Sequence, residues 1–363
     1  MLYELTAMLG LLVMGDPVAD PVGGGVPFED WFCSARRGDL ELPAPVARKA
    51  CGYRYVFVGG FRNERIPGYF AQNMAELRVL GVPRGSIHVI YPSSVQTAEQ
   101  NAGEVRARFL EIAGEGPEKL VVIAHSRGAC DTLAFAIANA GFVGDRVEAL
   151  FLVQGPFGGS GLAEYALGRG EPMDRRIPWR DRILGKLAGC AMRLTARGPG
   201  RDVLEGMTRE ASRAFWVEAL ARHAGAAETI GPRTFYVRSQ IEPSRLHFAR
   251  RAIAWYLRIH HGPGDGMVAL ADQMLPAVGT VVATLEAGHA DLTQRFPASR
   301  APKAMRRALI RSILMAVGQP AARVTDRGPT TSEPAQRVGP RRLMGLFPRK
   351  PGASPAGPVA SAK

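Results

Sequence analysis

The chain has 363 residues, of which 46% are hydrophobic and 22% are charged, and this balance excludes a fibrous or wholly disordered protein. Its formal net charge is +13, but residues 319–363 alone carry eight basic and two acidic side chains. No basic stripe interleaved with aromatic residues is present, so nucleic acid is not an expected partner. An anionic lipid surface is the more natural partner for the excess positive charge.

The cysteines and the N-terminal region limit the chemistry and the cell compartment. Cys33, Cys51, Cys130 and Cys190 have no CxxC spacing, so we expect neither a disulfide scaffold nor a zinc site, and no cofactor. A bridge between Cys33 and Cys51 stays open. The apolar run at 5–14 is too short to span a bilayer and lacks a basic region before it. We expect a cytoplasmic location, with export as the alternative.

Strands and helices are predicted to alternate after an N-terminal extension at 1–50, so we expect the fold to begin near residue 50. This rhythm predicts an α/β protein with a mostly parallel central sheet flanked by helices. The predicted strands are 53–58, 86–91, 119–125, 148–154, 234–237 and 280–286. The predicted helices are 70–80, 97–113, 128–140, 244–259 and 302–317.

A helical insertion at 162–231 interrupts the strand series. Within it, 179–195 and 203–224 carry apolar residues at helical spacing. We interpret the insertion as a cap or lid at the edge of the active site, with a purely structural subdomain as the alternative. The core then comprises 51–161 and 232–318, while 319–363 has little to bury and is predicted to be a disordered basic tail.

The most informative motif follows the predicted strand 119–125. Ser126 lies between two small residues, Ala124 and Gly128. A serine on a sharp turn from strand to helix needs small side chains two positions away on either side, because the neighbouring backbone crowds there. The pattern indicates a nucleophile elbow with Ser126 as the nucleophile.

Asp265 and His289 follow Ser126 in the order nucleophile, acid, base. A serine hydroxyl needs a base within hydrogen-bonding reach and a carboxylate that orients that base. Asp265 lies between two glycines, and His289 follows a glycine directly after a predicted strand. The alternatives for the acid are Asp272 and Asp291. The alternatives for the base are His88, His125, His223, His247, His260 and His261, of which His125 is expected to point away from Ser126 and to anchor the turn.

Two backbone amides are candidates for an oxyanion hole. One belongs to Arg127, directly after the proposed nucleophile, and the other to Phe61, which follows Gly59 and Gly60 at the end of the first predicted strand. An ordinary turn at the end of the strand is the alternative for Gly59 and Gly60.

Together these residues resemble the α/β-hydrolase superfamily, and within it the bacterial lipases and carboxylesterases, from Tyr53 to Val317. His125 to Gly128 is similar to the family's nucleophile motif, and Asp265 to Val268 to its acid motif. Residues 155–161 look like the lipase loop that follows the first strand after the nucleophile motif. Ala124 stands where the family usually has glycine, and Gly59 where many members have histidine.

The resemblance implies a serine hydrolase that cleaves carboxylic esters through an acyl-enzyme intermediate. Apolar residues of the insertion, among them Leu184, Leu187, Phe215 and Trp216, are compatible with a hydrophobic acyl chain. A thioesterase, an acyltransferase or a polyester depolymerase with the same three residues are alternatives. A hydrolase-fold protein that binds a ligand without catalysis is a further alternative.

Overall fold

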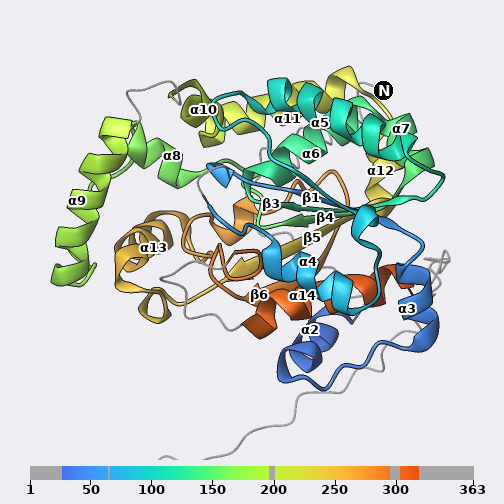
Figure 1. Ribbon diagram of the computed structural model, residues 1–363. Helices are drawn as coiled ribbons and strands as arrows, with labels where there is room; N and C mark the ends of the chain where they lie inside the picture. The colour runs from blue at the N-terminus through green and yellow to red at the C-terminus, as the bar shows by residue number, and fades with distance from the viewer. Residues whose placement is uncertain (1–26, 64–65, 196–200, 295–302, 319–363) are drawn as a thin grey trace, which may run out of the picture. The chain divides into compact units, whose positions relative to one another are not determined.

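The computed structural model describes residues 27–63, 66–195, 201–294 and 303–318, which belong to one unit, Met1–Ala321. Within these residues, six strands form one sheet in the order β2-β1-β3-β4-β5-β6, and every neighbouring pair is parallel (Figure 1). The strands are β1 (Arg54–Val58), β2 (Ile87–Ile90), β3 (Leu120–His125), β4 (Val147–Val153), β5 (Thr234–Gln240) and β6 (Thr280–Glu286). The predicted α/β class and parallel sheet are confirmed.

Helices connect the strands and cover both faces of the sheet. The α-helices are α2 (Phe28–Arg37), α3 (Ala44–Ala50), α4 (Ala71–Val79), α5 (Ala98–Gly114), α6 (Arg127–Ala138), α7 (Ala140–Arg146), α8 (Gly161–Ala166), α9 (Trp179–Thr195), α10 (Arg201–Gly206), α11 (Arg209–Arg222), α12 (Ala226–Ile230), α13 (Phe248–His261) and α14 (Lys303–Gly318). Short 3-10 turns are η2 (Arg84–Ser86), η3 (Gly231–Arg233), η4 (Pro243–Arg245) and η5 (Leu270–Asp272).

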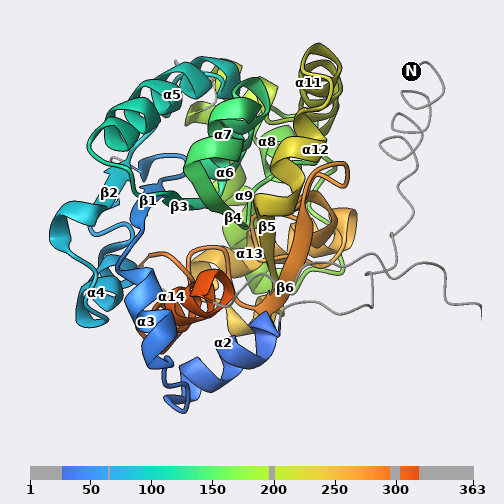
Figure 2. The same cartoon turned by 90° about the vertical axis from the view of Figure 1, so that its right-hand side faces the viewer.

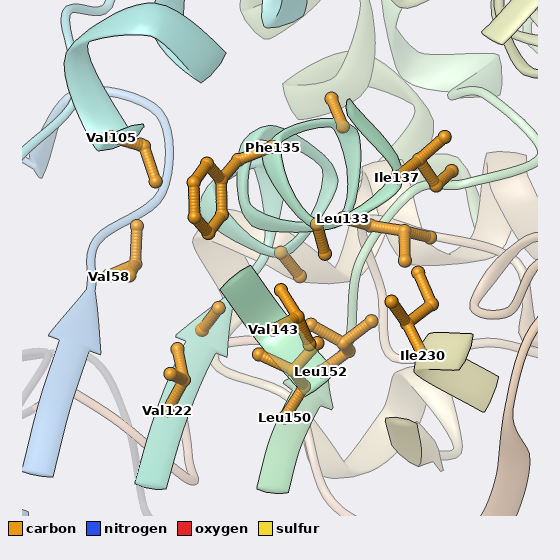
Figure 3. Packing of buried hydrophobic residues seen from close by; sticks show 14 of the residues in the cluster. Val58, Val105, Val122, Leu133, Phe135, Ile137, Val143, Leu150, Leu152 and Ile230 are labelled. Atoms are coloured by element: carbon orange, nitrogen blue, oxygen red, sulfur yellow. The ribbon is translucent and has the colours of Figure 1, made fainter. Parts of the chain in front are cut away.

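Alternate residues of the strands point to opposite faces and build two separate cores. Val122 of β3 and Leu150 of β4 pack under α5, α6 and α12, as Figure 3 shows. Ile123 and Phe151, their neighbours in sequence, pack with α2, α4 and α14 on the other face. Both faces are therefore covered, which explains the nearly continuous apolar sequence of the central strands.

The core extends further toward the N-terminus than the sequence predicts. Phe28 and Phe32 of α2 are buried in the same cluster as α14, and Figure 2 shows α2 beside that helix. The expectation that the fold begins near residue 50 is therefore wrong, because aromatic residues of α2 complete one face of the sheet. The Gly- and Pro-rich surroundings of this helix concealed it.

The insertion between β4 and β5 also differs in detail from its prediction. The single helix expected over 203–224 is two helices, α10 and α11. The break falls at Thr208, whose hydroxyl accepts a hydrogen bond from the Ala211 amide and caps the second helix. Helical spacing alone does not reveal a cap inside an apolar pattern.

Some expectations from the sequence lie outside the described residues, namely the disordered tail at 319–363 and the apolar run at 5–14. All four cysteines are free thiols, so Cys33 and Cys51 are not bridged. In the described part of the chain, no helix combines the length and the apolarity needed to cross a bilayer.

The burial of α2 predicts that a substitution in this helix lowers the free energy of unfolding. Phe28 is fully buried and its ring centroid lies 6.2 Å from that of Phe151. Phe28→Ala should lower the free energy of unfolding by about 3–5 kcal/mol in urea titrations, because it leaves a cavity at the sheet face. Val79→Ala, at a side chain that is 72% exposed, is the control and should change it by less than about 0.5 kcal/mol. Equal small effects would contradict the packing of α2.

Candidate active site

A sharp turn between β3 and α6 presents Ser126. Its backbone has φ 56° and ψ −133°, a conformation that side chains rarely adopt. A β-carbon at Gly128 would lie 2.3 Å from the Gly59 carbonyl oxygen, and one at Gly60 would lie 2.8 Å from the Ser126 β-carbon. Both positions therefore require glycine, and the backbone of the loop after β1 passes directly against Ser126.

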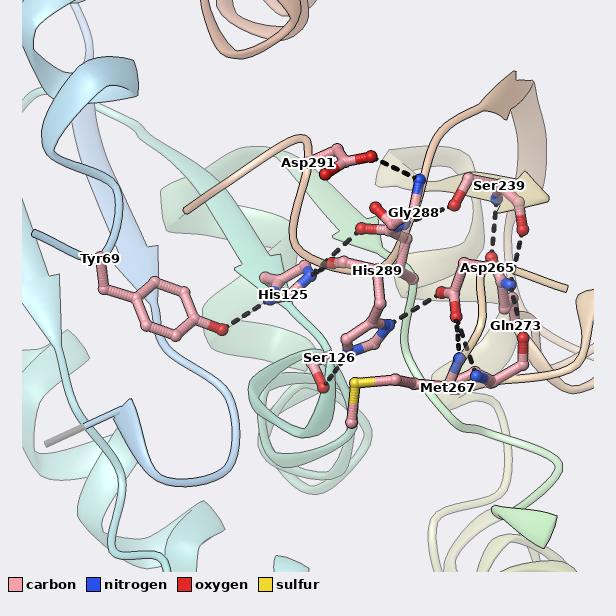
Figure 4. Close-up of polar contacts among 12 residues, drawn as sticks. Tyr69, His125, Ser126, Ser239, Asp265, Met267, Gln273, Gly288, His289 and Asp291 are labelled. Carbon is pink, nitrogen blue, oxygen red and sulfur yellow. Dashed lines mark hydrogen bonds and ion pairs between the residues drawn. The ribbon is translucent and has the colours of Figure 1, made fainter. Parts of the chain in front are cut away.

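Ser126, His289 and Asp265 form a continuous chain of hydrogen bonds (Figure 4). The distance from His289 Nε2 to Ser126 Oγ is 2.8 Å, and that from His289 Nδ1 to Asp265 Oδ2 is also 2.8 Å. Because a carboxylate only accepts, Nδ1–H donates to Asp265, which leaves Nε2 to accept the Ser126 hydroxyl proton. The structure thus brings together the three side chains that the sequence selected.

Backbone contacts hold the Asp265 carboxylate in place. Its Oδ1 accepts hydrogen bonds from the amides of Met267, at 2.9 Å, and Val268, at 2.8 Å. The His289 amide donates to the Asp265 carbonyl oxygen at 2.9 Å. The loops that carry the acid and the histidine are therefore joined through the backbone as well as through the side chains.

His125 connects three segments on the other side of the turn. Its Nε2 lies 2.7 Å from the His289 carbonyl oxygen, and its Nδ1 lies 2.6 Å from Tyr69 Oη. Burial, together with the charge of the nearby His289 ring, lowers the pKa of His125 to about 3, so the His125 ring is neutral. Nε2–H therefore donates to His289, Tyr69 donates to Nδ1, and Tyr69 accepts from the Gly60 amide at 3.1 Å.

Gln154 and Gln273 link the ends of β4 and β5 to the same loops. Gln154 lies directly after β4 with φ 54°, and its Oε1 is 3.1 Å from His125 Nε2. Gln273 accepts from the Ser239 amide at 2.7 Å and donates to the Val268 carbonyl oxygen at 3.2 Å. Sequence reasoning missed Tyr69, Gln154 and Gln273, because nothing in their local sequence marks them as partners of the site.

The Phe61 and Arg127 amides, the two candidate oxyanion donors, have no hydrogen-bond partner among the described residues. The Gly60 amide is already bound to Tyr69. Arg127 is the first residue of α6, so its N–H lies at the positive end of the helix dipole. Neither amide is therefore used by another described group.

The Arg127 side chain points away from the turn and stabilises a neighbouring loop. Its guanidinium is buried and donates to the carbonyl oxygens of Ser93 and Gln96. Asp131, one turn along α6, lies 3.9 Å from it and accepts from Asn101 at 2.9 Å. Burial raises the pKa of Asp131 to about 7, while Arg127 and Asn101 oppose that rise.

The other candidate acids have partners elsewhere. Asp272 pairs with Arg209 at 2.6 Å, and burial raises its pKa against the effect of that arginine. Asp291 Oδ2 accepts from the Gly288 amide at 2.8 Å. Among the described histidines, His289 is the one whose ring contacts the Ser126 hydroxyl. No group of three or more His, Cys, Asp or Glu in the described residues is placed to hold a metal ion.

Comparison with solved structures identifies the fold. A metagenomic carboxyl esterase superposes with a TM-score of 0.54 and 19% identity, over 86% of this chain and 89% of that chain. A mature lipase of Bacillus licheniformis superposes with a TM-score of 0.46 and 19% identity, over 69% of this chain and 88% of its own. No family model and no curated protein matches the sequence. The first similarity shows that the chain has the α/β-hydrolase fold.

The hydrogen bonds of His125 predict its protonation state. We expect long-range ¹H–¹⁵N NMR spectra to show a neutral ring with its proton on Nε2 from about pH 7 to about pH 4. An unfolded chain would protonate this histidine below about pH 6.5, so this residue should reduce stability as the pH falls from about 6.5 toward 3, by about 1.4 kcal/mol per pH unit. A proton on Nδ1, or a charged ring at about pH 5, would contradict the assignment.

Proposed function

We propose that this α/β-hydrolase-fold protein is a serine hydrolase that cleaves carboxylic esters. The apolar residues of the insertion expected to suit a hydrophobic acyl chain have other surroundings, since Leu184 and Leu187 are exposed and Trp216 is buried in the core. One observation carries the proposal: the Ser126 hydroxyl oxygen lies 2.8 Å from His289 Nε2, and the Ser126 backbone that presents it is strained, with a positive φ. Strain of this kind persists where the surrounding structure enforces it, and it is common at active sites. A purely structural serine has no need of such a conformation.

The reaction begins with the attack of Ser126 Oγ on the acyl carbonyl carbon. His289 Nε2 takes the hydroxyl proton, and Asp265 stabilises the resulting imidazolium through Nδ1–H. The carbonyl oxygen becomes an oxyanion, which accepts hydrogen bonds from the Phe61 and Arg127 amides. Each such donor is worth about 2.7–4 kcal/mol to the transition state.

The remaining steps release the alcohol and then regenerate the serine. When the tetrahedral intermediate collapses, its bond to the alcohol oxygen breaks, and that oxygen takes the proton from His289. Water then gives a proton to His289 and attacks the acyl-enzyme, and the carboxylic acid leaves as Ser126 recovers its proton. Asp265 is not protonated at any step, which agrees with its contacts to N–H donors.

Covalent labelling tests the role of the serine. A fluorophosphonate probe should label the wild-type protein and fail to label Ser126→Ala, because the probe reacts with an activated serine hydroxyl. Hydrolysis of p-nitrophenyl esters by this variant should fall by roughly 10⁴-fold or more. Mass spectrometry of the labelled protein should place the adduct on the peptide that contains Ser126. A wild-type protein that is folded but resists the probe would refute the proposal and favour a binding function.

The choice of acid can be tested with a matched pair of variants. Asp265→Asn should lower kcat by about 10⁴-fold, because an amide no longer stabilises the imidazolium or fixes its tautomer. Asp272→Asn is the control, since its side chain pairs with Arg209 and an amide oxygen still accepts that bond. It should leave kcat nearly unchanged. A larger loss in the Asp272 variant would show that Asp272, and not Asp265, is the acid.

A further inference from the structure

The outer face of α9 carries exposed apolar side chains in one stripe. Trp179, Ile183 and Leu187 are 61%, 53% and 65% exposed. They are spaced four residues apart, so they lie on one side of the helix. Leu184 beside them is also exposed, and together these four make up four of the ten large apolar side chains that are exposed in the described residues. Apolar groups that gather in this way mark an interaction surface rather than scattered surface residues.

The opposite face of α9 is already packed against the protein. Asp181, Gly185 and Gly189 are buried there. A β-carbon at Gly185 would lie 2.6 Å from Met173 Cε, and one at Gly189 would lie 2.4 Å from Tyr165 Oη. This face lies about 200° around the helix from the apolar stripe, at 3.6 residues per turn. The stripe therefore points outward while the opposite face of α9 is packed against the protein. Figure 1 shows α9 at the outer edge of the molecule.

Basic residues border the apolar stripe. The sequence of α9 has four basic residues and one acidic residue, and that acid, Asp181, lies on the buried face. Arg180 and Lys186 are exposed and have no ion-pair partner among the described residues. The Arg180 guanidinium lies 5.3 Å from the centroid of the Trp179 ring. The surface therefore combines apolar groups with unneutralised positive charge.

The stripe lies on the side of the sheet where the proposed active site opens. α8, which starts the insertion, follows the loop after β4, and α13, which packs on α9, follows the end of β5. Phe248, at the start of α13, and Met267, two residues after Asp265, are exposed as well. In Figure 4 the Met267 side chain extends toward Ser126. Exposed apolar groups therefore occur on α9, on α13 and beside the proposed nucleophile.

We propose that the outer face of α9 docks onto a membrane surface that contains anionic lipid. Trp179, Ile183 and Leu187 insert at the level of the headgroups, where tryptophan is favoured, while Arg180 and Lys186 contact lipid phosphates. A second copy of the chain is a poorer partner, because two cationic helices would repel one another. Docking does not depend on the proposed ester hydrolysis, although it would bring lipid esters to the side of the protein that carries Ser126.

Vesicle binding tests the proposal separately from catalysis. The chain is used with Ser126→Ala throughout, so that no lipid is hydrolysed, and is sedimented with vesicles of phosphatidylcholine alone or mixed with phosphatidylglycerol. The parent chain should bind the mixed vesicles. Changing Trp179, Ile183 and Leu187 together to Ser should weaken binding by at least about tenfold (~1.4 kcal/mol). Arg180→Glu with Lys186→Glu should weaken it by at least about fivefold per charge (~1 kcal/mol each) on the anionic vesicles alone.

Matched changes elsewhere on the surface are the controls. Val79→Ser with Leu110→Ser removes two other exposed apolar side chains, and Arg78→Glu with Arg84→Glu makes the same change in net charge. Neither pair should alter binding to the mixed vesicles. A fluorophore on the exposed thiol of Cys190, with Cys33 and Cys51 changed to Ser, should shift to the blue when vesicles are added, since Cys190 lies on the same side of α9.

Three results would overturn the proposal. The parent chain could fail to bind either type of vesicle, or the control pairs could weaken binding as much as the α9 variants do. Light scattering could also show a dimer that only the α9 substitutions dissociate, which would assign the stripe to a second copy. Urea titrations establish that each variant is folded. The fluorophosphonate experiment on the chain with Ser126 intact reports on the proposed function independently of all three.

Discussion

The close approach of α6 to the end of β1 is the contact on which the candidate site depends. No side chain fits at Gly128, because the Gly59 carbonyl oxygen occupies the space that a β-carbon would need. This contact lets the helix begin immediately after Ser126 and holds the serine in a conformation with positive φ. It also brings the loop after β1 beside the serine, so the Phe61 amide and the start of α6 lie on adjoining backbone. A bulkier residue would separate the two segments and relax the turn.

A buried chain of hydrogen bonds, in which every donor points the same way along the chain, holds the loops around this turn. It runs from the Gly60 amide through Tyr69 and His125 to the His289 carbonyl oxygen. The chain has this direction because the imidazole is neutral, with a donor at Nε2 and an acceptor at Nδ1. A charged ring would have two donors and would conflict with the tyrosine proton. The burial that lowers the pKa of His125 therefore helps to hold these loops in place, because it keeps the ring neutral.

The insertion between β4 and β5 combines close packing with an unusual surface. Gly185 and Gly189 let α9 approach Met173 and Tyr165 closely, and the helix is thereby fixed on the protein by its small residues. Trp179, Ile183 and Leu187 are left on the opposite side, in contact with solvent. Most helices of this protein do the reverse and place their large residues inside, as Figure 3 shows for α6. This inversion distinguishes α9 from a helix that only completes the core.

The sequence by itself determined the features that depend on short-range sterics and periodicity. The alternation of strands and helices predicts the parallel sheet, and the small residues around Ser126 predict the turn, because both constraints act over a few neighbouring residues. The sequence also selected Asp265 and His289, from glycines beside them and from chain order. Tertiary structure alone decided that Tyr69 and Gln154 belong to the same network and that α2 is part of the core. Those contacts join segments far apart in the chain, and their partners are set by how the sheet and its helices pack, which no local pattern records.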